Sequence, residues 1–459
     1  MLKLSRLARN VFIFFFVSWL FFPGASFATM ATSVQQYGVT WYFDKEHRVG
    51  QYANGDWWVL GPVKITNITP QSTQQSDGRI INGTMVNARG GGSHGYDNYD
   101  SGGGPDSPIR RYSESQNRAP SRTGEPLALT TGTVFSSISI PDSEIGSNAR
   151  PALDTIALLT VVDEVPPTGA FRPNPYSSDN KVARWNESDL DYSVLQSLDP
   201  VASTPNLADV KRNVQRFWNE QDTDWIARPI HPRSNMPTYG RAMGTVMGEA
   251  LLMLHLDFTN AEKRDLFVSV VQYGLDIYGR LQVGALAGGS GWIPNGGHNN
   301  GRKMPMILAG LALDSSTILA EADRELDPVR FQEDGQTWIV TESDLNKSAH
   351  ANPYTSEHLG MPEWSFRYWD NKNSGDSNWN ASYRWIGSAM LSHALTAHLM
   401  PGAVEAWNWS PFFDYMDRYF EKGSPSDSGL NAIQPFTRDM WSAYRNIGAN
   451  RPRPPTLLE

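Results

Sequence analysis

The residues best suited to chemistry lie in one glycine-rich loop, GGSGWIPNGGHNNGRKMPM, which runs from Gly288 to Met306. The loop carries His298, Arg302 and Lys303 and contains no acidic residue, although the formal net charge of the chain is −9. Its glycine-rich backbone could present N–H groups to an anion. Side chains of these types, held together, would suit a carboxylate, a sulfate or a phosphate.

The loop belongs to the longer of two windows that lack acid. One window runs from Ile277 to Leu313, and the other, from Trp225 to Arg241, also contains Tyr239. An acidic chain that keeps two windows free of acid is expected to keep one region positive, as a pocket for anions requires. Ordinary surface charge that falls this way by chance is the alternative interpretation.

Composition excludes several kinds of site. The chain has no cysteine, which rules out disulfides, thiolate metal ligands and thiol nucleophiles. The spacing of a phosphate-binding P-loop is absent, and the acid-poor loop lacks the clustered carboxylates that Mg²⁺ or Ca²⁺ prefers. We therefore expect no metal and no cofactor. A sequence pI near 5.5 argues against a nucleic-acid partner.

The N-terminus has the pattern of a secretory signal peptide over residues 1–28. Basic residues precede an apolar run from Val11 to Phe22, and small residues precede the expected cleavage after Ala28. The run is shorter than the roughly 20 residues that span a bilayer. We expect export to the periplasm or outside the cell, without stable membrane insertion after cleavage. An uncleaved membrane anchor is the alternative.

The rest of the chain divides by the period of its hydrophobic pattern. Residues 29–165 alternate and are rich in aromatic and β-branched types, which predicts a β-rich N-terminal region. Residues 166–181 hold several prolines and are predicted to be a linker. Residues 182–459 carry apolar residues at helical spacing and are predicted to form a catalytic α/α toroid of helical hairpins. The expected fold class is therefore mainly α, with a plain helical bundle as the alternative.

Four segments of the helical region resemble one family of enzymes. They are VQYGLDIYGR, GSGWIPNGGHNNGRKMPMILAGLAL, YTSEHLGMPEWSFRYW and SYRWIGSAMLSHALTAHLM. They look like the helical domain of polysaccharide lyases resembling family 38, which includes glucuronan and alginate lyases, and the GGHxxGRK and LGMPEW motifs are the more specific part. The resemblance implies β-elimination on a uronic-acid polymer, an anionic polysaccharide, inside an α/α barrel.

Such a reaction needs three contributions from the site. A donor must neutralise the C6 carboxylate, a base must take the C5 proton, and an acid must protonate the O4 leaving group. Glucuronate and mannuronate carry H5 and O4 on the same side of the ring, so one tyrosine can act first as base and then as acid. Guluronate favours two different residues. An arginine or lysine must assist the tyrosine, whose ordinary pKa is about 10.

The resemblance also implies roles for individual residues. His298 matches the histidine that such lyases place on one loop. Asn295, Asn299 and Asn300 are the candidates that would neutralise the carboxylate. Tyr354, in NPYTSEHLGMPEW, matches the tyrosine that follows later in the chain and would be base and acid.

This sequence departs from the family pattern just before Tyr354. The family has an arginine there, whereas this segment has Lys347. Arg302 is the first candidate for the missing charge, with Arg367 and Arg384 as the others. Tyr383 is the alternative tyrosine, followed by Tyr239 and Tyr368. The residues assigned to substrate binding are Asn295, Asn299, Trp292, Tyr239, Arg241, Lys303, Arg367, Tyr383 and Arg384.

Two other functions stay open on the sequence. An inverting glycoside hydrolase would need two carboxylates about 6.5–9.5 Å apart across a cleft, and the acid-free loop argues against it. A non-catalytic carbohydrate-binding protein would account for the many aromatic residues. The acids available to a hydrolase are Asp222, Asp224, Glu363 and Asp370. For Glu363 we expect a role in orienting an arginine, and the role of a hydrolase acid is the rival.

Overall fold

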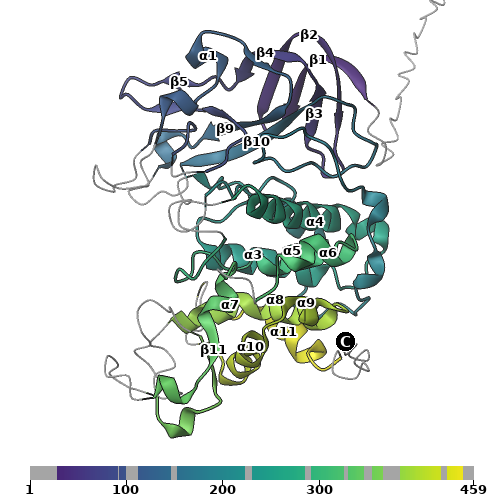
Figure 1. The fold of residues 1–459 in the computed structure, drawn as a ribbon, viewed down its shortest axis with the longest axis vertical. Helices are drawn as coiled ribbons and strands as arrows, with labels where there is room; N and C mark the ends of the chain where they lie inside the picture. The colour runs from purple at the N-terminus through teal and green to yellow at the C-terminus, as the bar shows by residue number, and fades with distance from the viewer. Residues whose placement is uncertain are drawn as a thin grey trace, which may run out of the picture.

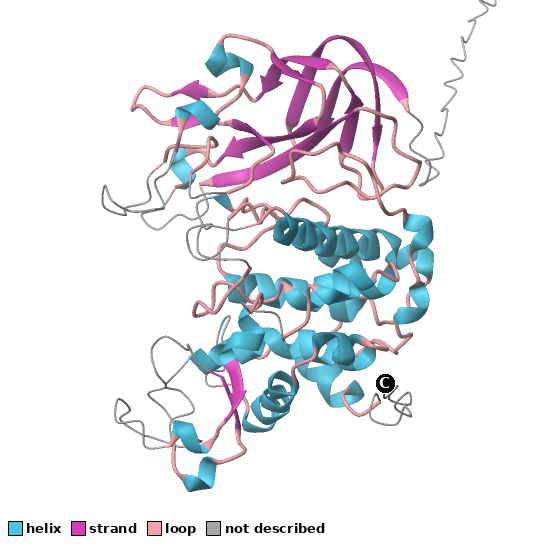
Figure 2. Ribbon diagram, viewed as in Figure 1, coloured by secondary structure: helices cyan, strands magenta, loops and turns pink. Residues whose placement is uncertain are grey.

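The chain is described by a computed structural model in which the elements lie in layers (Figure 1). A curled sheet occupies one end, and helices lie beneath it in successive layers (Figure 2). The described residues are 28–90, 93–99, 112–145, 152–222, 230–284, 291–324, 329–345, 354–364, 383–424, 429 and 432–447. All of the predicted signal peptide except residue 28 therefore lies outside them.

The N-terminal strands form one mixed sheet of eight strands. Their order is β7-β9-β10-β3-β2-β4-β8, with β1 also paired to β2. The pair β10 with β3 is parallel and the other pairs are antiparallel. The strands are β1 (Thr29–Gln36), β2 (Val39–Gln51), β3 (Trp57–Leu60), β4 (Val63–Thr69), β7 (Thr84–Val86), β8 (Leu127–Leu129), β9 (Gly132–Ser139) and β10 (Leu153–Val162). Two small ladders join β5 (Thr73–Gln74) to β6 (Ile80–Ile81) and β11 (Thr337–Ile339) to β12 (Pro362–Trp364).

The two faces of the sheet are buried in different ways. Along β2, Val39, Trp41 and Phe43 alternate with more exposed residues and line a core enclosed by the curled sheet. The central strand β10 is buried on both faces, because Leu159 joins that core while Leu158 packs with residues outside the sheet. A strand buried on both faces reads as a continuous apolar run, as β10 does.

The helices stack below the sheet. Helix α4 is nearest the strands, α3 and α5 lie next, α8 follows, and α10 and α11 are outermost (Figure 1). Helix α4 contacts α5, α3 contacts α8, and α8 contacts α10 and α11. The helices are α1 (Pro120–Thr123), α2 (Leu207–Val214), α3 (Gly240–Met253), α4 (Asn260–Gln282), α5 (Lys303–Ala312), α6 (Ser316–Ala320), α7 (Gln332–Gln336), α8 (Gly387–Leu399), α9 (Ala403–Trp407), α10 (Ser410–Lys422) and α11 (Pro435–Tyr444). Short 3-10 helices lie at Glu114–Gln116, Asp142–Glu144, Glu187–Asp189, Tyr192–Val194, Glu342–Asp344, Ser356–His358 and Tyr383–Ile386.

The expected mainly α toroid is wrong. The described chain combines an eight-stranded curled sheet with layered helices, so the sheet is a main layer and not an appendage. Helical spacing alone overestimated how much of this region forms long helical hairpins, because α6, α7 and α9 have only five residues each. Between α7 and α8, moreover, the chain forms the ladder of β11 with β12. A hydrophobic period identifies a helix but does not fix how helices close on one another.

The segment predicted as a linker is packed between the sheet and the helices. Phe171 and Tyr176 are buried in it, and the Arg172 side chain is fully buried. Arg172 donates from Nε to Asp56 at 2.6 Å and from Nη2 to Asp276 at 2.6 Å. Because Asp56 precedes β3 and Asp276 lies on α4, this ion triad ties the sheet to the helices. The domain boundaries at residues 165 and 181 stay predictions.

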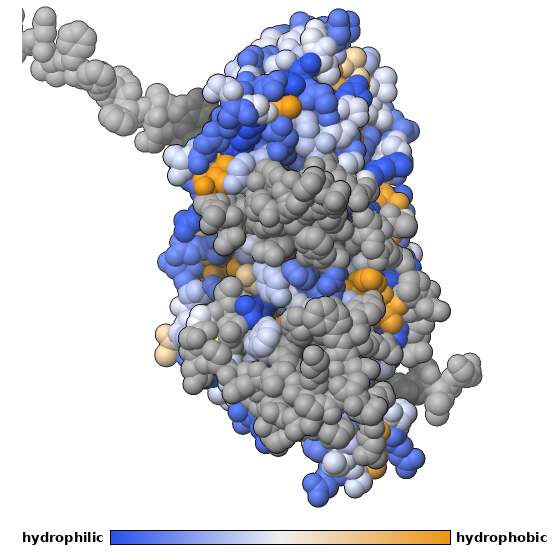
Figure 3. All heavy atoms as spheres, turned by 90° about the vertical axis from the view of Figure 1, so that its left-hand side faces the viewer, coloured by the Kyte–Doolittle hydropathy of each residue, from blue (hydrophilic) through white to orange (hydrophobic). Residues whose placement is uncertain are grey.

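Few large hydrophobic side chains of the described residues are exposed. Figure 3 shows one face, on which hydrophobic residues are scattered among polar ones. The large apolar side chains that are exposed lie far apart in the chain, for example Met30, Val182 and Ile447. Of the helices in the described part of the chain, none has the length and apolar character needed to cross a membrane.

Candidate functional site

Three polar side chains from the two acid-free windows meet at the start of α3. The rings of Tyr239 and His298 lie edge to face, with centroids 4.8 Å apart. The guanidinium of Arg241 lies 5.6 Å from the centre of the Tyr239 ring. All three side chains are half-buried. A phenol, an imidazole and a guanidinium therefore lie side by side within reach of solvent.

Close backbone contact holds the glycine-rich loop against α3. The Arg241 N–H donates to the Gly297 carbonyl at 2.9 Å. A Cβ added to Gly240 would lie 1.9 Å from the carbonyl oxygen of His298, and one added to Gly297 would lie 2.5 Å from the Tyr239 hydroxyl. Glycine at these positions therefore lets the loop approach the helix, which is what brings His298 to Tyr239.

This contact predicts different outcomes for two glycines of α3. The variant Gly240→Ala should lower the free energy of unfolding by about 1–3 kcal/mol, because the new methyl group meets backbone atoms that cannot move aside. A Cβ on Gly244 would meet its nearest atom at 3.6 Å, an ordinary contact. Gly244→Ala is the matched control, and the helix propensity of alanine should make it neutral or stabilising. Urea unfolding measures both, and equal losses would contradict the assigned contact.

Arg302 of the loop is held in a buried ion pair. Its Nε donates to Glu220 at 3.0 Å, and both side chains are almost fully buried. Glu220 also accepts from the Tyr273 hydroxyl at 2.8 Å and from Trp292 Nε1 at 3.0 Å. Burial alone would lower the pKa of Arg302, but the Glu220 carboxylate outweighs it and the pKa lies above its usual value. Arg302 also donates to the carbonyl of His298 at 3.2 Å, so it supports the loop from within.

Lys303 is neutralised in a separate buried pair. Its Nζ donates to Asp334 at 2.6 Å and to the carbonyl of Trp407 at 2.7 Å, and the side chain is fully buried. Trp407 Nε1 donates to the other oxygen of Asp334 at 3.0 Å. The two adjacent cations that suggested an anion pocket thus have carboxylate partners from distant parts of the chain.

The short helix α7 forms a polar cradle under the loop. Gln332 Oε1 accepts from the backbone of Asn295 at 2.9 Å and of Asn299 at 3.3 Å. Its Nε2 donates to Asn300 Oδ1 at 2.6 Å. The next residue, Glu333, accepts from the Gly301 N–H at 2.6 Å. Two adjacent side chains of α7 therefore fix the backbone of the loop on both sides of His298.

Glu333 should make stability depend on pH. It is fully buried, and burial raises its pKa to about 7. The pKa of the Glu333 carboxyl group is therefore higher in the folded chain than its unfolded value of about 4.3. Its contribution to stability is complete below pH about 4.3 and is lost as the pH rises through about 7. Glutamine does not titrate, so Glu333→Gln escapes this loss. As the pH rises from about 4.3 to above 7, the free energy of unfolding of the variant should come to exceed that of the wild type by about 1–3 kcal/mol. Urea unfolding at several pH values tests this, and parallel pH profiles of the two proteins would contradict it.

Tyr354 lies in a different cluster, built around Glu363. Its hydroxyl donates to Glu363 Oε2 at 2.9 Å, and the side chain is buried. Arg384 donates to the same oxygen at 2.6 Å, and Arg418 donates to Oε1 at 3.1 Å. Burial first, and then the charge of Glu363, raises the pKa of Tyr354 far above its ordinary value. The expectation that Glu363 orients an arginine is confirmed.

Two tyrosines connect this cluster to the group at α3. Tyr419 lies near enough to Arg241 for the guanidinium to oppose the effect of burial, which raises the pKa of Tyr419 to about 12. The ring of Tyr415 lies 6.1 Å from that of Tyr419, and the pKa of Tyr415 is affected by Glu363 and Arg384. The Glu363 cluster is therefore linked to the solvent-facing group through Tyr415 and Tyr419.

The remaining predicted site residues fall into two sets. Trp292 and Asn299 are buried, and the Asn299 side chain donates to the carbonyl of Ile293 at 2.8 Å. Asn295 is half-buried, and its side chain makes no hydrogen bond to a described residue. Outside the described residues lie Arg367, Tyr368, Lys347, Asp224, Asp370 and the side chain of Tyr383. Within the described part of the chain, no group of three His, Asp or Glu residues is placed to hold a metal.

Sequence reasoning missed Glu220 and the acids of α7. The available signal was the charge balance. Basic residues in an acid-free window need carboxylates from other parts of the chain if they are buried. Candidates were visible as NEQD after Trp218 and QEDGQ after Phe331, short acidic runs that directly follow aromatic residues. Their burial was the unexpected part, because runs of polar residues usually lie on the surface.

In comparisons with known proteins, no family model, no curated protein and no solved structure matched this chain. The resemblance to polysaccharide lyases therefore stays a prediction from sequence motifs, and any proposed function depends on the geometry of the site.

Proposed function

We propose that this protein is a polysaccharide lyase that cleaves a uronic-acid polymer, such as glucuronan or alginate, by β-elimination. The observation that carries the proposal is the half-buried group of Tyr239, Arg241 and His298 at the start of α3. It combines the residue types that the reaction needs in a place that solvent reaches. Export by cleavage of residues 1–28 is proposed on the sequence pattern alone.

In this proposal Tyr239 takes the C5 proton and returns a proton to O4. Arg241 supplies positive charge beside the phenol, which favours the phenolate. Burial lowers the pKa of Arg241, yet an arginine stays protonated, so the charge is retained. His298 and the side chain of Asn295, which lie in the same turn, would donate to the C6 carboxylate and stabilise the charge that develops on it.

Tyr239 replaces Tyr354 as the proposed base for two physical reasons. The Tyr354 hydroxyl already donates to a carboxylate, and proton loss there would place two negative charges beside each other. Tyr354 is also buried, with only 2% of its surface exposed, whereas Tyr239 is half-buried. A base must come within hydrogen-bond distance of the substrate proton. The family pattern of a later tyrosine is therefore not followed in this proposal.

Two buried acids among the described residues are poorly placed to act in hydrolysis. Glu363 is bound by two arginines and a tyrosine, and Glu220 by an arginine, a tyrosine and a tryptophan. A carboxylate whose oxygens are occupied in this way has little freedom to protonate a glycosidic oxygen.

A panel of polymers tests the proposal. The chain from residue 29 onward is incubated with glucuronan, polymannuronate and polyguluronate, and the ultraviolet absorbance of the C4–C5 double bond is followed together with new reducing ends. We expect both signals to rise together on at least one polymer. Reducing ends without the absorbance would identify a hydrolase, and neither signal on any polymer would overturn the proposal.

A further inference from the structure

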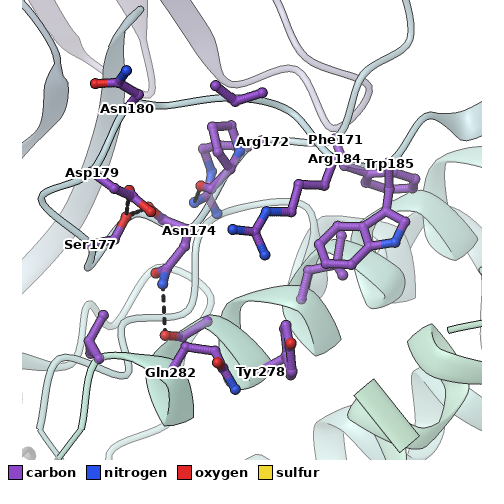
Figure 4. Close-up of a pocket in the computed structure, with 15 residues that line it drawn as sticks. Phe171, Arg172, Asn174, Ser177, Asp179, Asn180, Arg184, Trp185, Tyr278 and Gln282 are labelled. Carbon is purple, nitrogen blue, oxygen red and sulfur yellow. Dashed lines mark hydrogen bonds between the residues drawn. The ribbon is translucent and has the colours of Figure 1, made fainter. Parts of the chain in front are cut away.

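A cavity lies away from the Tyr239 group, beside the C-terminal end of α4. It is a cavity of about 610 Å³, lined on one side by residues of the 171–185 segment and on the other by Leu275, Tyr278, Gly279 and Gln282 of α4 (Figure 4). This volume falls within the range of about 300–1,000 Å³ typical of small-molecule sites. Tyr239, Arg241 and His298 are not among its lining residues, so it is a separate site.

Arg184 gives the cavity an unneutralised positive charge. Its side chain is exposed and extends into the cavity between the two walls (Figure 4). Among the described residues it has no hydrogen-bond or ion-pair partner, whereas Arg172 in the same wall is held by two carboxylates. The lining acid Asp179 lies across the cavity and accepts from the hydroxyl of Ser177 (Figure 4). An anionic group would therefore find a free guanidinium here.

Two aromatic rings stand beside Arg184. Trp185 and Tyr278 pack edge to face with centroids 6.2 Å apart, and both are half-buried. Large rings that are partly exposed at a cavity offer flat apolar surface with polar edges, which suits the apolar face of a sugar ring. Gln282 lies in the same lining and donates from Nε2 to Glu321 at 3.2 Å, and its carbonyl oxygen can accept from a hydroxyl group of a sugar.

The wall of the cavity is fixed in advance. Lys181 is buried, and its Nζ donates to the carbonyls of Asn174 at 2.8 Å and Ser177 at 2.6 Å, which closes the turn between these residues. Asn174 Nδ2 donates to the carbonyl of Gly279 at 2.8 Å and joins the turn to α4. A wall held in this way loses little freedom when a ligand binds.

We propose that this cavity is a second, non-catalytic binding site for a uronate-bearing segment of an anionic polysaccharide. The carboxylate would pair with Arg184 while the sugar ring lies against Trp185. This inference rests on the proposed function for the choice of polymer. Such a site would hold the chain of a long substrate near the protein while another part of it reaches Tyr239.

Hydrogen exchange with a matched pair of ligands tests the site. The probes are a tetrasaccharide of β-1,4-linked glucuronate and its neutral counterpart, cellotetraose, which lacks only the carboxylates. The acidic probe should slow exchange in residues 171–185 and 275–283, and the neutral probe should slow it far less. Arg184→Ala should weaken the binding of the acidic probe at this site roughly tenfold, because a hydrogen bond to a charged group is lost. Trp185→Leu should weaken it as well.

Two outcomes would overturn the inference: no protection of these segments, or equal protection in the wild type and in Arg184→Ala. The test of this binding site can fail or succeed independently of the test of the proposed reaction. Protection of the cavity without any unsaturated product would leave this site standing while the lyase proposal fails. Unsaturated product without protection would do the reverse.

Discussion

Replacing Tyr239 by phenylalanine should lower kcat on the cleaved polymer by at least about a hundredfold, because a proton-transferring side chain contributes roughly a hundredfold to ten-thousandfold. The change removes one hydroxyl and keeps the ring that packs against His298. The fold should therefore survive, and KM should change much less than kcat, since the lost interaction acts in the transition state. Initial rates from ultraviolet absorbance, with circular dichroism to verify folding, measure this effect.

Tyr354→Phe is the control for that prediction. It removes a hydroxyl group from a buried tyrosine that donates to Glu363. We expect a rate within a few-fold of the wild type and a loss of about 1–3 kcal/mol in the free energy of unfolding, because a buried carboxylate loses one of its donors. An inactive Tyr354→Phe beside an active Tyr239→Phe would assign the base to Tyr354 and reject the geometry proposed for Tyr239.

Loss of the Glu220 carboxylate should cause the largest loss of stability. Glu220→Gln keeps the shape of the side chain but leaves the Arg302 guanidinium buried without a counter-charge. Removing one partner of a buried ion pair costs about 3–5 kcal/mol. Since Arg302 also holds the carbonyls of His298 and Asn300, activity should fall together with stability. Urea unfolding of the variant and the wild type measures the loss.

The exposed pair of Arg212 with Asp209 is the matched control. Both of its side chains are more than half exposed, so Asp209→Asn should change stability by less than about 1 kcal/mol. The double variant Glu220→Gln with Arg302→Met should recover part of the loss, because no charge is then left buried. A loss for Glu220→Gln no larger than that for Asp209→Asn would show that Glu220 is not the counter-charge of Arg302.

Local patterns in the sequence pointed to some elements of the fold but not to their assembly. The alternation of Val39, Trp41 and Phe43 marks β2 as a strand, and these residues line one core. Nothing in such a pattern states that the sheet is a main layer or that β3 pairs with β10 in parallel. Pairings between distant segments depend on contacts that a local period does not contain.

The candidate site shows the same limit at the level of single residues. The acid-free windows did contain Tyr239 and His298, but nothing in the sequence placed them together. Their contact depends on Gly240 and Gly297, where a Cβ would collide with the other segment. Arg302 and Lys303 looked available for a ligand because their partners, Glu220 and Asp334, are distant in the chain. The net charge of a sequence window does not show whether acidic residues from other parts of the chain neutralise its basic residues.

Mass spectrometry of the products tests the central claim most directly. The chain from residue 29 onward is incubated with glucuronan, and the oligosaccharides released are weighed. β-Elimination breaks the C4–O4 bond without adding water and leaves the double bond on the new non-reducing end. We therefore predict that all products except those from the original non-reducing end of a polymer chain carry an unsaturated uronate and are lighter by one water than hydrolysis products of the same length. If all the products had the full mass of hydrolysed oligosaccharides, this would contradict the account of Tyr239, Arg241 and His298 as an elimination site.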